Sequence, residues 1–153
     1  MRTQRIWQPA AALAIGSASL FGAWAAHAVY NPPIHMANGI EYMSGGASSD
    51  EGELMETVAP RWPATFEFSI RDGKRSDFAG EVLVTVRNAS GEPVLSRVAA
   101  DGPVMVARLD PGRYEVEATL AGHTLRQQVE IVAGSGTRTL FVWPAGTSIS
   151  AHS

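Results

Sequence analysis

The chain has 153 residues, of which 45% are hydrophobic and 18% charged, with 15 Gly, 9 Pro and no Cys. This composition excludes a disordered chain, a collagen-like chain and a disulfide scaffold, and the length suits one domain. A formal net charge of −3 argues against a nucleic-acid-binding protein, because phosphates require a basic surface.

Residues 1–28 predict a secretory signal peptide. Arg2 and Arg5 form a basic start, the following stretch is apolar and rich in Ala, and Ala26-His27-Ala28 supplies the small residues that signal peptidase requires. We expect cleavage before Val29. The alternative is an uncleaved membrane anchor, because the apolar run approaches the length that spans a bilayer.

The mature chain has the composition of a bacterial periplasmic protein. All 15 acidic residues but only 10 of the 12 Lys+Arg follow the leader, so the mature net charge is −5. Lys74 is the only Lys, and Ala and Gly are abundant, a bias typical of bacteria with GC-rich genomes. Since the chain has no Cys for an oxidising compartment, we expect a conventional core without disulfides.

Residues 29–47 predict an extended tail ahead of the folded domain. Turn residues at Asn31-Pro32-Pro33, Asn38-Gly39 and Gly45-Gly46 interrupt every apolar pair, so no continuous strand or helix is expected. The segment still carries more apolar side chains than a solvated tail requires. It either packs against its own domain or docks onto a partner, and we favour docking. The candidate docking residues are Tyr30, Ile34, Met36 and Tyr42.

Residues 48–60 predict one short helix. Ser48-Ser49-Asp50-Glu51 is a capping-box pattern with carboxylates in the first turn, where the helix dipole favours them. Leu54, Met55 and Val58 then form an apolar stripe, and Pro60 stops the helix. We expect a helix from Ser49 to Ala59.

Residues 61–144 predict an all-β domain, because apolar and polar residues alternate with a period of two and turn signals separate the runs. Short turns between seven strands indicate a seven-stranded antiparallel β-sandwich. Residues 145–153 are expected to form a disordered C-terminal tail. The expected strands lie at 64–71, 82–87, 93–98, 104–109, 114–120, 124–132 and 137–143.

The run Leu109-Asp110-Pro111-Gly112-Arg113-Tyr114-Glu115-Val116, with Gly122 in the next turn, resembles carboxypeptidase regulatory-like domains of the transthyretin-like (prealbumin-like) class. The resemblance implies a turn at Pro111 and Gly112 before a core strand, with Tyr114 between the sheets of a transthyretin-like or Ig-like sandwich. The mature chain also looks like small proteobacterial periplasmic proteins that carry such a domain. These domains are non-catalytic modules, so the resemblance implies that the chain is not an enzyme.

The candidate chemical sites are weak. His35, His123 and His152 lack a second ligand at zinc spacing, so we expect no metal, cofactor or catalytic residue. Copper is the alternative, because Met36, Met43 and Met55 accompany His35 and thioethers select Cu(I).

We therefore expect a non-catalytic periplasmic binding or structural accessory module that contacts an envelope protein or a polysaccharide. It would bind no nucleic acid and would not span the membrane after the leader is removed. The alternative is a small periplasmic copper-binding protein or enzyme that uses the His- and Met-containing N-terminal segment.

Overall fold

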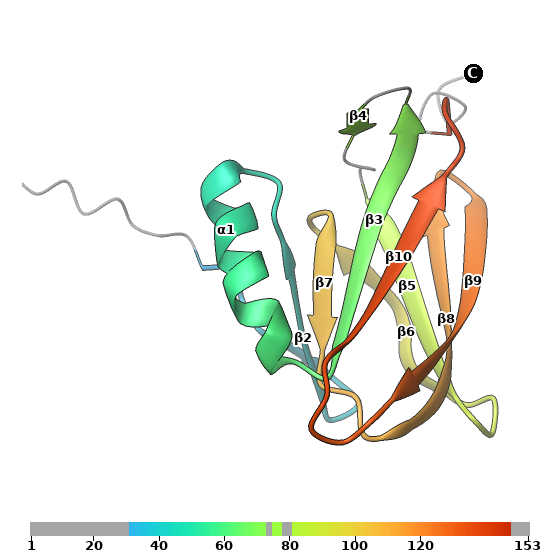
Figure 1. Cartoon of the computed structure of the whole chain (residues 1–153). Helices are drawn as coiled ribbons and strands as arrows, with labels where there is room; N and C mark the ends of the chain where they lie inside the picture. Colours follow the sequence, from blue (N-terminus) through green and yellow to red (C-terminus); the bar gives the residue numbers. More distant parts are fainter. Residues whose placement is uncertain (1–30, 73–74, 78–80, 148–153) are drawn as a thin grey trace, which may run out of the picture.

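The computed structural model describes residues 31–72, 75–77 and 81–147. The predicted signal peptide (residues 1–28), Tyr30 and residues 148–153 of the predicted C-terminal tail lie outside the described residues. Within the described residues two β-sheets pack face to face as a sandwich, and helix α1 lies on the outer side of one sheet (Figure 1).

We call the two sheets sheet I and sheet II. Sheet I has the strand order β1 (His35–Ala37), β2 (Ile40–Gly45), β7 (Val104–Ala107), β3 (Ala64–Asp72) and β10 (Thr137–Trp143), and β4 (Arg75–Asp77) also pairs with β3. Sheet II has the order β6 (Pro93–Ala100), β5 (Val82–Asn88), β8 (Gly112–Leu120) and β9 (His123–Ile131).

The β-sandwich is confirmed, but the strand count and the purely antiparallel pairing are corrected. All seven predicted strands are present, and β1, β2 and β4 add to them. In addition, β10 pairs with β3 in parallel, from Thr137 opposite Ala64 to Trp143 opposite Ile70. The parallel pair arises because residues 132–136 carry the chain from sheet II back to sheet I, where β10 runs in the same direction as β3.

The extended tail expected for residues 29–47 is not observed at residues 35–45, which form a hairpin. Asn38 (φ 50°) and Gly39 (φ 74°) make a two-residue turn with both residues at positive φ, the type I′ geometry that suits the twist of paired strands. β2 then pairs with β7, and Ile40 and Tyr42 pack against the core between the sheets. The sequence analysis takes Asn38-Gly39 as a break between apolar residues, whereas these two residues form the turn of a hairpin.

The predicted short helix is confirmed. α1 (Ser49–Val58) begins after Ser48, whose hydroxyl accepts from the Glu51 N–H at 3.3 Å, and the Glu51 carboxylate accepts from the Gly46 N–H at 2.9 Å. A 3₁₀ turn, η1 (Ala59–Arg61), contains Pro60 and follows directly. Within the described residues, no helix is long and apolar enough to cross a membrane.

α1 covers the outer face of sheet I at β2 and β7. The fully buried Met55 side chain packs there with Met43, Val104 and Val106. Because alternate residues of these strands face opposite sides, sheet I is buried on both faces at this point. The helix, sheet I and sheet II therefore form three layers, as Figure 1 shows.

Aromatic residues of the parallel pair dominate the core between the sheets. Phe68 lies 5.8 Å from Phe141 and 6.2 Å from Trp143 between ring centroids. The Trp143 indole N–H donates to the His123 carbonyl at 2.9 Å, so its one polar group is satisfied in sheet II. The rings consequently fill the space between the sheets and connect them.

A close backbone approach fixes the junction between β2, α1 and the β6–β7 turn. A Cβ atom on the buried Gly102 would lie 2.2 Å from the Gly45 carbonyl. The β6–β7 turn and β2 therefore touch through backbone atoms alone. Beside this contact, the Ser44 hydroxyl accepts from the Asp101 N–H at 2.8 Å. No side chain larger than hydrogen fits at Gly102 unless β2 moves.

We expect Gly102→Ala to lower the free energy of unfolding by about 2 kcal/mol or more, because the added methyl overlaps the backbone of β2. The matched control is Gly52→Ala inside α1, where a Cβ meets only the Gly46 carbonyl oxygen, at 3.9 Å. That change is expected to stabilise the protein by about 1 kcal/mol through helix propensity. Urea unfolding of both variants checks the pair, and equal effects would contradict the close approach.

Candidate binding groove

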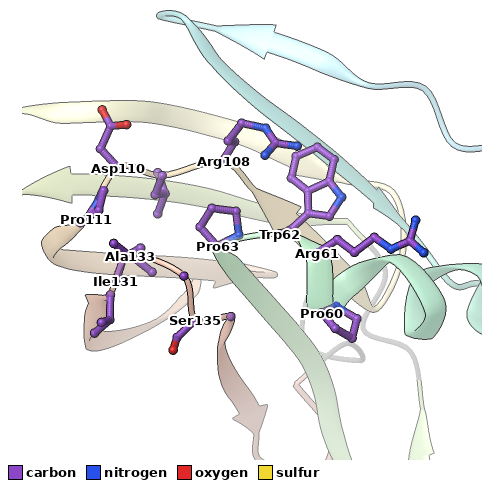
Figure 2. Close-up of a pocket in the computed structure, with 14 residues that line it drawn as sticks. Pro60, Arg61, Trp62, Pro63, Arg108, Asp110, Pro111, Ile131, Ala133 and Ser135 are labelled. Atoms are coloured by element: carbon purple, nitrogen blue, oxygen red, sulfur yellow. The ribbon is translucent and has the colours of Figure 1, made fainter.

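A groove of about 400 Å³ lies at one end of the sandwich. Three segments that are far apart in the sequence line it, and Figure 2 shows them converging. They are residues 60–63 from η1 to the start of β3, residues 108–111 between β7 and β8, and residues 131–136 from the end of β9 to the start of β10.

About half of the groove wall is apolar. The rings of Pro60, Pro63 and Pro111 contribute to it, and Figure 2 shows Pro63 between the other two. Val132, which also lines the groove, is 52% exposed. Rigid proline rings and an exposed aliphatic side chain offer an apolar surface that loses little conformational entropy on contact.

Charged groups mark the two sides of the groove. The Arg108 guanidinium lies 4.6 Å from the Trp62 ring centroid, and its Nε donates to the Glu41 carboxylate at 3.1 Å. Arg61 and Asp110 lie on opposite sides in Figure 2, and neither forms an ion pair with another described residue. These two exposed side chains therefore keep their charges available to a bound molecule.

Glycines in the 131–136 segment allow the groove to form. Gly134 has φ 78°, and the Ser135 N–H donates to the Val132 carbonyl at 3.2 Å, which closes a tight turn. A Cβ on Gly136 would meet the Trp62 carbonyl oxygen at 3.3 Å, so a glycine there lets the loop lie against residues 60–62. This loop lies between the strands expected at 124–132 and 137–143.

Of the predicted turn residues, Pro111 lines the groove, and Gly112 and Tyr114 follow it in β8. Gly112 has φ 153°, a conformation that favours glycine, and Tyr114 is 8% exposed. The Tyr114 hydroxyl donates to the Asp110 carbonyl at 2.7 Å, four residues upstream, an arrangement like the tyrosine corner of β-sandwiches. Burial raises the pKa of Tyr114, and the Asp110 carboxylate raises it further. Tyr114 therefore fixes the loop that carries Pro111.

The structure does not bring the candidate docking residues together. Ile34 and Met36 are 61% and 67% exposed, whereas Tyr42 is half-buried and stacks on His35 with 5.3 Å between ring centroids. Tyr30 lies outside the described residues. Ile34 and Met36 thus form the accessible part of the predicted set.

The copper-ligand candidates are also separated. His35 lies on the core side of the hairpin against Tyr42, and Met43 is buried on the other face beneath α1. The described residues contain no group of three or more His, Asp or Glu side chains placed to hold a metal ion.

The sequence reading missed the groove residues Pro60, Trp62, Arg108 and Val132. The clustering of Pro and Gly in these segments predicts that they are loops. It does not predict which loops lie next to each other in the folded domain. That information depends on strand order.

Neither a family model nor a curated protein sequence matches the chain. Among solved structures, the Bacillus anthracis TIE protein is similar over 54% of this chain, with 15% sequence identity and a TM-score of 0.32. The similar part spans only 16% of that protein's length. A similarity at this level supports no argument about fold or function.

Tyr114→Phe is expected to lower the free energy of unfolding by about 1 kcal/mol at neutral pH, because the hydroxyl bond to the Asp110 carbonyl is lost. The folded-state pKa of Tyr114 is raised above its unfolded value of about 10. Its stabilising contribution is therefore complete below pH of about 10 and is lost as pH rises through the folded-state pKa. Urea unfolding from pH 7 to 11 checks both points. Wild-type and variant curves that fall equally in the alkaline range would show that Tyr114 is not responsible.

Proposed function

We propose that the protein is a non-catalytic binding or structural accessory module of the bacterial periplasm, of carboxypeptidase regulatory-like type, and that it contacts another envelope protein through the groove. The observation that carries this proposal is the groove itself, where three loops on a rigid sandwich present proline rings, Val132 and two charges that form no ion pair with another described residue. Loops held by a rigid scaffold are the usual place for binding surfaces in sandwich folds.

The lining favours a protein over a polysaccharide. Sugars are commonly held against exposed aromatic faces, but Trp62 is buried and the Arg108 guanidinium covers its ring. The surfaces left open are Pro60, Pro111 and Val132, which suit an apolar side chain of a protein segment. Arg61 and Asp110 can then pair with charges on either side of that side chain.

Photo-cross-linking in intact cells tests the groove. A photoreactive amino acid at Val132 is expected to give a covalent product of discrete mass, whose second component is an envelope protein identified by mass spectrometry. Leu140 is the matched control, because it is 51% exposed against 52% for Val132 and does not line the groove. We expect no product from Leu140.

Arg61→Glu combined with the photoreactive residue at Val132 is expected to lose the product, because the charge at one side of the groove is reversed. Equal products from Val132 and Leu140, or none from Val132, would contradict the proposal. A product whose mass falls on treatment with a cell-wall glycosidase instead of a protease would identify a polysaccharide ligand.

The periplasmic assignment has its own test. N-terminal sequencing of the protein from a periplasmic extract is expected to begin at Val29, because Ala26-His27-Ala28 provides the cleavage site. Recovery of the intact leader in the membrane fraction would support the anchor alternative.

A further inference from the structure

Unpaired strand edges invite pairing with another chain, and sandwiches usually protect them. The facing edges of β9 and β10 are occupied by side chains. Gln127 Nε2 donates to the Leu140 carbonyl of β10, and the Trp143 indole donates to the His123 carbonyl of β9. An added strand would therefore meet a carbonyl on each edge that already accepts a side-chain hydrogen bond.

The edge of β6 is protected in a different way. Its first residue is Pro93, which has no N–H, and Arg97 at φ 48° forms an irregularity where the register with β5 shifts. The Val94 carbonyl accepts from Asn38 Nδ2 at 3.3 Å. An added strand would meet an interrupted ladder on this side.

The edge of β1 is open among the described residues, since β1 pairs with β2 alone. The two-residue turn makes Ala37 and Ile40 a hydrogen-bonded pair, so Met36 and Glu41 form the next, non-hydrogen-bonded pair. Glu41 accordingly directs its carbonyl to β7, where it accepts from the Arg108 N–H at 2.9 Å. The peptide groups of Met36, and by alternation those of Ile34, therefore face away from β2.

The same two residues have the most exposed large apolar side chains in the described part of the chain, 61% for Ile34 and 67% for Met36. The open edge is also short. Pro32 and Pro33 precede it without N–H groups, and the Asn38-Gly39 turn follows it. An added strand can thus form regular bonds only along Ile34–Met36, which restricts its register.

We propose that two copies of this chain associate by pairing β1 with β1 in antiparallel orientation, about a two-fold axis at His35. Ile34 then exchanges both peptide hydrogen bonds with Met36 of the second copy, and Met36 does so with Ile34 of the second copy. The two His35 residues form the non-hydrogen-bonded pair between them. Sheet I continues from one copy into the other, and the groove is not used.

A second copy fits this edge because the segment is self-complementary. When a second copy of Ile34-His35-Met36 runs antiparallel to the first, Ile34 of one copy lies opposite Met36 of the other, so apolar residues face each other. Every outward N–H then lies opposite an outward carbonyl. A shift by two residues would set Met36 opposite Pro32, which has no N–H to donate, or Ile34 opposite Asn38, which lies in the turn. The interface is small, so the association is expected to be weak and dependent on concentration.

Cysteine cross-linking tests the proposed register, because the natural sequence has no Cys. Opposed residues of a non-hydrogen-bonded pair lie about 4.5 Å apart between Cα atoms, within the range that a disulfide bridges. His35→Cys is expected to form a disulfide-linked dimer under mild oxidation. Leu140→Cys, at a similarly exposed site away from β1, is expected to remain monomeric at the same concentration.

Met36→Pro removes the N–H that faces the open edge and leaves the bonds of His35 and Ala37 to β2 in place. It is expected to suppress the His35→Cys cross-link, and sedimentation of the chain without Cys should show a monomer–dimer equilibrium that Met36→Pro and Ile34→Lys abolish. Circular dichroism confirms that these variants are folded. The proposal would be overturned by equal cross-linking of His35→Cys and Leu140→Cys, or by a cross-link that Met36→Pro does not affect. A wild-type chain that stays monomeric up to millimolar concentration would also overturn it.

Discussion

The parallel pairing of β3 with β10 is the constraint on which both the core and the groove depend. It sets Ala64 opposite Thr137 and Phe68 opposite Phe141, so the largest core rings lie together on the inner face of sheet I. Parallel strands need a long connection, and here the whole of sheet II provides it. The pairing therefore joins residues that are 73 positions apart in the sequence, since 137 − 64 = 73.

A second constraint holds the hairpin and the helix to this frame. The contact of Gly45 with Gly102 brings β2 against the β6–β7 turn, and the Ser44 hydroxyl and Glu51 carboxylate satisfy backbone N–H groups beside it. The Ser44-Gly45-Gly46 segment is thus structural. Because it fixes the start of α1, it also determines which face of β2 the helix covers.

Local patterns in the sequence predicted the helix and seven strands, because period and capping depend on neighbouring residues. The hairpin was missed because β1 has only three residues, and β2 is buried on both faces at Met43 and Ser44 and shows no clean alternation. The Asn38-Gly39 signal was present and was read as a break. The parallel direction of β10 had no local signal, since residues 132–136 suit a hairpin loop as well as a crossing between sheets.

The groove was beyond prediction for the same reason. Parallel strands begin at the same end of a sheet, so the pairing of β3 with β10 places residues 60–63 beside residues 131–136. An antiparallel pairing would have placed Trp143 next to Ala64 and left Pro60 far from Gly136. Tyr114 was predictable because its turn is contiguous in the sequence. The segments that line the groove near Val132 come together only because of the strand order. The groove of this domain is therefore a property of its topology, and the same motif around Pro111 and Tyr114 would not reproduce it on a sandwich with a different strand order.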